Sequence, residues 1–195
     1  MWKNPYDQLE LPGTYGYDFG DYDSDPMDED EDGHGTHCAG VISAVSDNNK
    51  GICGISNAKL MALKVFNSAG TSYDSAIIAA FNYIYKAQTL GANIAAINCS
   101  WGGGGSSSTS MKTLINQIGQ NGSLFLFAAG NDGEDHNNAI SDGCPYDLDS
   151  PYVVTVGAST QTDKKASFSD YGNKTVHLFA PGRNIFSTIN SDVFY

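Results

Sequence analysis

A histidine surrounded by small residues has the clearest chemical potential in this sequence. Residues 34–40 read His-Gly-Thr-His-Cys-Ala-Gly. An imidazole can take a proton from a hydroxyl nucleophile and return it to a leaving amine. The glycines on both sides of His34 would let another backbone approach closely. A helix-capping or buried histidine is the plain alternative. A metal site of His34, His37 and Cys38 is a weaker one, because the sequence offers no obvious fourth ligand.

The elements that must position this histidine alternate between short apolar runs and helical stripes. This alternation predicts an α/β fold with a mostly parallel sheet and helices on both faces. Residues 1–33 show no periodicity and are predicted to be irregular loops. The predicted helices are 34–45, 71–90 and 110–120, and the predicted strands are 60–66, 94–99, 123–129, 152–157 and 175–179.

The apolar run 124–129 leads into Gly130 and Asn131. Open α/β sheets bind ligands at the carboxyl ends of their strands. The carboxamide of Asn131 could therefore donate a hydrogen bond to an oxyanion that develops during a reaction. The plain alternative is a turn made by Asn131, Asp132 and Gly133.

These features resemble the subtilase family of serine proteases. Gly-Tyr-Asp-Phe at 16–19, the His34 motif, Phe-Ala-Ala-Gly-Asn at 127–131 and Phe-Ala-Pro-Gly at 179–182 stand in the family's order. The resemblance implies a subtilisin-like three-layer α/β fold, with His34 as general base and Asn131 in the oxyanion hole. It also implies that two segments line the substrate site: Ser100, Trp101 and Gly102, and Ala128, Ala129 and Gly130.

The segments that carry the family's triad aspartate and serine have no match in residues 1–195. Gly-Thr-Ser at 70–72 precedes Asn131, whereas the family's nucleophile follows that asparagine, and Ser72 is expected to cap a helix. Neither Asp7 nor Asp18 follows the strand that ends in the family's aspartate. We therefore expect a partial catalytic domain, cut at both ends and inactive by itself. The alternative is a non-catalytic remnant that binds calcium or peptides.

Acidic residues are concentrated before the histidine motif. Nine of the 22 Asp and Glu residues lie between positions 18 and 32. Oxygen ligands at this density suit Ca²⁺, although Pro26 excludes an EF-hand. The pattern at 18–26 resembles the calcium loop of thermitase-like subtilases, and a solvated acidic loop is the alternative. Residues 28–32 are expected to be solvated charge. The predicted calcium ligands are Asp18, Asp21, Asp23 and Asp25.

The net charge of −12 argues against nucleic-acid binding, which requires a basic surface. The sequence shows neither a transmembrane stretch nor a signal peptide. By family, we expect a secreted or cell-surface monomer that acts on protein or peptide substrates. The four cysteines allow three pairings. Cys38 and Cys99 are expected to be buried free thiols, and helical spacing should place Cys38 beneath His34.

Overall fold

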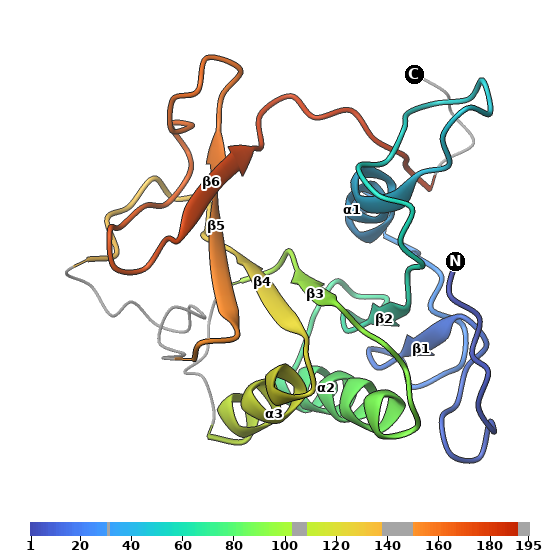
Figure 1. Cartoon of the computed structure of the whole chain (residues 1–195). Helices are drawn as coiled ribbons and strands as arrows, with labels where there is room; N and C mark the ends of the chain where they lie inside the picture. The colour runs from blue at the N-terminus through green and yellow to red at the C-terminus, as the bar shows by residue number, and fades with distance from the viewer. Residues whose placement is uncertain (31, 103–108, 138–149, 191–195) are drawn as a thin grey trace. The chain divides into compact units, whose positions relative to one another are not determined.

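The computed structural model describes residues 1–30, 32–102, 109–137 and 150–190, and Figure 1 shows its trace. The chain divides into two compact units. Unit 1 comprises Met1–Leu90 together with the segment that begins at Phe186, and unit 2 comprises Gly91–Ile185.

Unit 1 contains a two-stranded parallel sheet. Strand β1, Gly16–Asp18, pairs with β2, Ala62–Lys64, and Gly16 lies opposite Ala62. Gly16 has a φ of 150°, and a Cβ there would lie 1.6 Å from the Ala62 carbonyl oxygen, so only glycine fits. The prediction that residues 1–33 are irregular was wrong at β1. A three-residue strand is too short to show a period of two.

The core of unit 1 forms on helix α2, Asp74–Thr89. The Tyr83 hydroxyl donates a 2.8 Å hydrogen bond to the Pro12 carbonyl, and its ring packs on Tyr17 and Phe19. Burial raises the pKa of Tyr83 to about 12. The predicted apolar stripe of this helix is confirmed. Its buried residues are Ala76, Ile77, Ala80, Phe81, Tyr83, Ile84 and Ala87.

The start of α2 differs from the prediction. The helix begins at Asp74 rather than at residue 71, and its N-cap residue, Tyr73, makes no side-chain capping bond. Ser72 instead donates its hydroxyl to the Val65 carbonyl at 2.8 Å and forms a bridge with Phe66. The predicted capping role of Ser72 was therefore wrong, because its hydroxyl is used to close the turn after β2.

Helix α1, His34–Ser43, begins at the catalytic candidate. Its N-cap, Gly33, has a left-handed φ of 58° and no side chain to cap the helix. Asp28 supplies the cap from outside, because its Oδ2 accepts hydrogen bonds from both the backbone N–H and the hydroxyl of Thr36, each at 2.8 Å. The prediction that Asp28 is merely solvated charge was therefore wrong.

The chain returns to α1 in residues 187–190. Ser187 donates its hydroxyl to the His37 carbonyl at 2.6 Å, and Thr188 donates to the Thr36 carbonyl at 2.8 Å. A Cβ at Gly40 would lie 2.2 Å from the Thr188 hydroxyl oxygen, so this glycine permits the close approach. A segment about 150 residues later in the chain thus fixes the first turns of the helix that carries His34.

Unit 2 contains a four-stranded sheet in which every strand is parallel to its neighbours (Figure 1). The strands lie in sequence order: β3, Ala96–Cys99; β4, Leu124–Ala128; β5, Val153–Ser159; and β6, Leu178–Pro181. The predicted α/β class with parallel strands is confirmed. Each predicted strand in this unit overlaps an observed one, with ends displaced by no more than three residues.

The core of unit 2 lies between β4, β5 and helix α3, Thr109–Gln120. Phe125 and Phe127 alternate along β4 and are almost fully buried. Gly119 lets α3 approach the sheet, because a Cβ there would lie 2.1 Å from the Tyr152 ring. The buried side chains of α3 follow helical spacing and are Met111, Leu114, Ile115 and Ile118.

Candidate active site

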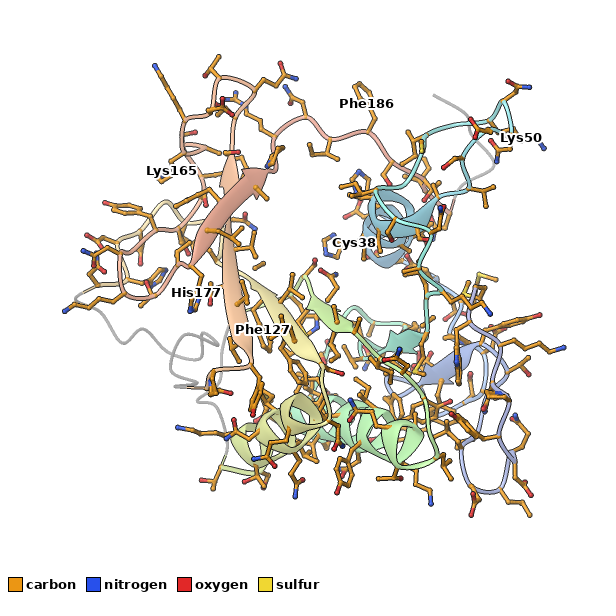
Figure 2. All side chains as sticks on the ribbon, in the orientation of Figure 1. Cys38, Lys50, Phe127, Lys165, His177 and Phe186 are labelled. Carbon is orange, nitrogen blue, oxygen red and sulfur yellow. The ribbon has the colours of Figure 1, made fainter. Side chains whose placement is uncertain are left out.

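The two predicted substrate segments leave the sheet side by side. Cys99, the last residue of β3, lies opposite Phe127 of β4. Residues 100–102 and 128–130 therefore emerge at the carboxyl ends of adjacent parallel strands, where such sheets bind ligands. The Trp101 ring packs edge-on against Phe127, with centroids 5.6 Å apart. Figure 2 shows Phe127 on its strand.

Asn131 is exposed just beyond this edge. It follows Gly130, whose φ of 112° is a conformation that residues with a side chain rarely adopt. The Gly130 carbonyl accepts a 3.1 Å hydrogen bond from the Asp170 N–H. The turn is thus fixed by its backbone, and the Asn131 side chain is not needed inside it. This arrangement suits a carboxamide that donates to a ligand.

His34 occupies the first position of α1 in unit 1 and is solvent-exposed. The Cys38 sulfur lies 3.8 Å from its Nε2, one helical turn along, and Figure 2 shows Cys38 on this helix. The expected stacking of Cys38 beneath His34 is confirmed. His34 belongs to unit 1, whereas Asn131 and the substrate segments belong to unit 2.

The predicted calcium ligands surround a lysine. Asp18 is buried, and its Oδ2 accepts a 2.6 Å hydrogen bond from the ammonium of Lys64. The same ammonium donates to Asp21 at 2.9 Å. The Asp18 Oδ1 accepts the N–H groups of Gly20 and Asp21, at 2.7 and 3.0 Å. Both oxygens of Asp18 are therefore engaged within the protein. We call this arrangement the Asp18–Lys64–Asp21 cluster.

The electrostatics of this cluster favour the ion pair. The hydrogen bond from Lys64 lowers the pKa of the Asp21 carboxyl. Burial by itself would lower the pKa of Lys64, but its two carboxylate partners raise it overall. The positive charge of Lys64 thus balances the negative charges of Asp18 and Asp21.

The other two predicted calcium ligands bind backbone groups of their own loop. Asp23 and Asp25 are exposed, and each accepts a backbone N–H two residues later in the chain. Among the residues that the structure describes, no group of three or more His, Cys, Asp or Glu side chains could hold a metal ion. Calcium would have to displace the Lys64 ammonium.

Three cysteines in the described ranges are free thiols. Cys99 is buried, and burial raises the pKa of its thiol. Cys38 is half-buried and Cys53 is exposed. The prediction of free thiols at Cys38 and Cys99 is confirmed, although Cys38 is only partly buried. Cys144 lies outside the described residues.

Comparison with known proteins agrees with the motifs. The profile of the Subtilase family, Peptidase_S8, matches residues 5–194. Thermitase of Thermoactinomyces vulgaris is 33% identical over 180 residues, which cover 92% of this chain and 59% of thermitase. An extracellular basic protease of Dichelobacter nodosus is 36% identical over 163 residues, or 80% of this chain and 26% of that protein.

A solved structure of a subtilisin-like protease also resembles this chain. The crystal structure of a cold-adapted subtilisin-like serine proteinase superposes with a TM-score of 0.66 at 32% identity, covering 92% of this chain and 60% of the other. The fold and the motifs thus define a chain of the subtilisin-like α/β class. The chain belongs to the subtilase family. It spans only part of the length of these relatives.

Proposed function

We propose that the protein containing this chain is a serine endopeptidase of the subtilase type. Family membership supports this proposal, and one structural observation carries it most directly: an exposed His34 at the start of a helix that is anchored from two distant segments. In this proposal His34 accepts the proton of a serine hydroxyl and returns it to the leaving amine.

The remaining site residues take roles that their positions support. Asn131, exposed beyond β4, donates its amide N–H to the oxyanion. Residues 100–102 and 128–130 line the substrate site, since an extended peptide can add main-chain hydrogen bonds beside such strand ends. The triad carboxylate and serine come from parts of the protein outside residues 1–195.

We further propose a secreted, monomeric enzyme whose substrates are proteins or peptides. The Dichelobacter nodosus relative is named an extracellular protease. The part of the chain that the structure describes contains no helix long and apolar enough to cross a membrane. Calcium binding by Asp18, Asp21, Asp23 and Asp25 is also a proposal, and it requires Ca²⁺ to replace Lys64 in the cluster.

The test is hydrolysis of a peptide anilide by the protein extended at both ends to include the triad segments. We expect turnover that a serine-directed sulfonyl fluoride abolishes, with one equivalent of label incorporated. The chain of residues 1–195 by itself should show no turnover, because a triad without its nucleophile retains only weak catalysis. An extended, folded protein that neither hydrolyses the anilide nor takes up the label would favour the non-catalytic alternative.

A further inference from the structure

One buried aspartate holds the loop that carries Asn131. Oδ1 of Asp170 accepts the backbone N–H groups of Asp132 at 2.9 Å and Glu134 at 3.0 Å. Its Oδ2 lies 3.0 Å from the Nε2 of His136. With the bond from its own N–H to Gly130, Asp170 contacts the Asn131 loop, residues 130–136, at four points on both sides of Asn131.

The two side chains of the Asp170–His136 contact are removed from water. The side chains of Asp170 and His136 are only 4% and 5% exposed. Burial would raise the pKa of Asp170, but hydrogen bonds from His136 and from two backbone N–H groups lower it overall. Asp170 is therefore a carboxylate at neutral pH. Removing either partner would leave the other buried without its match.

Asp170 is itself fixed to the rigid part of the sheet. The neighbouring Ser169 accepts the N–H of Ala158 in β5 at 2.8 Å and donates its hydroxyl to the Asp170 carbonyl at 3.0 Å. Lys165 donates to the Ser169 carbonyl at 2.8 Å. A continuous series of hydrogen bonds thus runs from β5 through Ser169 and Asp170 to the Asn131 loop.

Bonds between backbone groups hold only one side of Asn131 directly, through the Asp170 N–H and the Gly130 carbonyl, and the other backbone bonds lie further along the loop. The Gly133 N–H donates to Phe168, and the His136 N–H donates to Tyr171. Neither of these bonds reaches the residues next to Asn131. The Asp170 carboxylate supplies the bond to the N–H of Asp132, the residue that follows Asn131.

We propose that Asp170, held by His136, is a positioning residue for the oxyanion donor Asn131. This inference rests on the proposed function. An oxyanion donor acts chiefly on the transition state, so a displaced Asn131 lowers kcat more than it changes KM. Asp170 touches no substrate in this account and acts only through the Asn131 loop.

The kinetic test uses the extended, active protein with Asp170→Ala and Asp170→Asn. We expect Asp170→Ala to lower kcat on the order of tenfold, less than the ~10²–10³ loss known from subtilisin when its oxyanion asparagine is removed. KM should stay within about twofold. Asp170→Asn keeps an oxygen for the two backbone N–H groups and should recover part of the rate. The matched control is Asp135→Ala, since the exposed Asp135 side chain accepts the N–H of Asn137, two residues later in the chain.

A double-mutant cycle separates positioning from general damage. In an Asn131→Ala background, Asp170→Ala should cost little further kcat, because the group that it positions has gone. The same tenfold cost in both backgrounds, or a cost that falls on KM, would overturn the proposal. If Asp170→Ala does not fold, the same double-mutant cycle with Asn131→Ala is measured with Asp170→Asn and with His136→Gln.

Amide hydrogen exchange tests the contact without any reference to catalysis. Asp170→Asn and His136→Gln should speed exchange at Asp132 and Glu134, while Phe125 and Phe127 in β4 stay protected. Unchanged exchange at Asp132 and Glu134 would overturn the proposal. If exchange is faster in these variants but Asn131→Ala leaves kcat unchanged, the result would instead contradict the oxyanion role of Asn131 in the proposed function.

Discussion

Two buried aspartates, one in each unit, use the same hydrogen-bond pattern over very different lengths of chain. In both Asp18 and Asp170, one carboxylate oxygen accepts two backbone N–H groups and the other meets a cationic or titratable nitrogen. The two N–H donors to Asp18 lie two and three residues away, whereas those to Asp170 lie 38 and 36 residues away.

The two carboxylates therefore stabilise different kinds of contact. Asp18 shapes its own local turn and ties it to β2 through Lys64, a side chain that stays charged across the physiological pH range. Asp170 instead joins a remote loop to the sheet through its contacts with Asp132, Glu134 and His136. The first arrangement stabilises a fold, and the second also positions residues that can act on a ligand.

The largest effect should follow the loss of Asp18. Asp18→Ala removes the buried one of the two carboxylate partners of Lys64 and the acceptor of two backbone N–H groups, and we expect the free energy of unfolding to fall by about 3–5 kcal/mol. The exposed Asp25, which accepts one backbone N–H, provides the control, and Asp25→Ala should cost about 1 kcal/mol or less. Denaturant unfolding measures both. Equal costs would show that the Asp18–Lys64–Asp21 cluster has no special role.

Calcium should compete with Lys64 for the same oxygens. We expect Ca²⁺ at a hundred times its dissociation constant to stabilise the fold by about 2.7 kcal/mol. The Lys64→Met variant should respond at lower Ca²⁺ because its carboxylates lack the ammonium. Melting curves with and without millimolar Ca²⁺ measure this. A response that persists in Asp21→Asn/Asp23→Asn, or that is missing in Lys64→Met, would refute calcium binding at these carboxylates.

Acid should weaken the contacts that the Asp170 carboxylate makes with the Asn131 loop. Its pKa in the folded protein is lowered, so its stabilisation is present above the unfolded pKa of about 3.9 and is lost as the pH falls toward the folded value. We expect wild type to exceed Asp170→Asn in unfolding free energy by about 1.5–3 kcal/mol at pH 7, with the gap closing below pH 4. A gap that is unchanged at pH 3 would contradict a charged Asp170.

Alkali should weaken the Lys64 contact instead. The folded pKa of Lys64 is raised, so its stabilisation is complete below the unfolded pKa of about 10.4 and is lost as the pH rises through the folded value. The difference between wild type and Lys64→Met should therefore persist in acid until the carboxylates protonate. A difference that disappears near neutral pH would contradict this assignment.

The smallest expected effects concern the cysteine thiols: Cys38 in unit 1 and Cys99 in unit 2. Cys38→Val keeps a similar apolar volume and should cost less than about 1.5 kcal/mol and little activity. A mercury adduct at Cys38 lies close to His34 and should inhibit the extended enzyme, whereas buried Cys99 should react slowly. Inhibition assays on wild type, Cys38→Val and Cys53→Ser measure this. Sensitivity that follows Cys53 would place the inhibitory adduct away from His34.

Periodic elements were predictable from the sequence because burial repeats along them. The stripe of α2 and the strands of unit 2 are the clear examples, and the His34 and Asn131 motifs were also visible. The single charge in the apolar run 60–66, Lys64, was a signal for a buried ion pair that the analysis of the sequence missed. The pairing of His136 with Asp170 gave no such signal, because the two residues lie 34 positions apart, on either side of β5.

In the proposed mechanism His34 is the general base of a serine peptidase, and the His34→Ala variant of the extended protein is its sharpest test. We expect kcat for a peptide anilide to fall by several orders of magnitude, as known from subtilisin, while the melting temperature changes little because His34 is exposed. His37→Ala, in the same turn, is the matched control and should retain far more activity. Full activity in a folded His34→Ala variant would contradict the account.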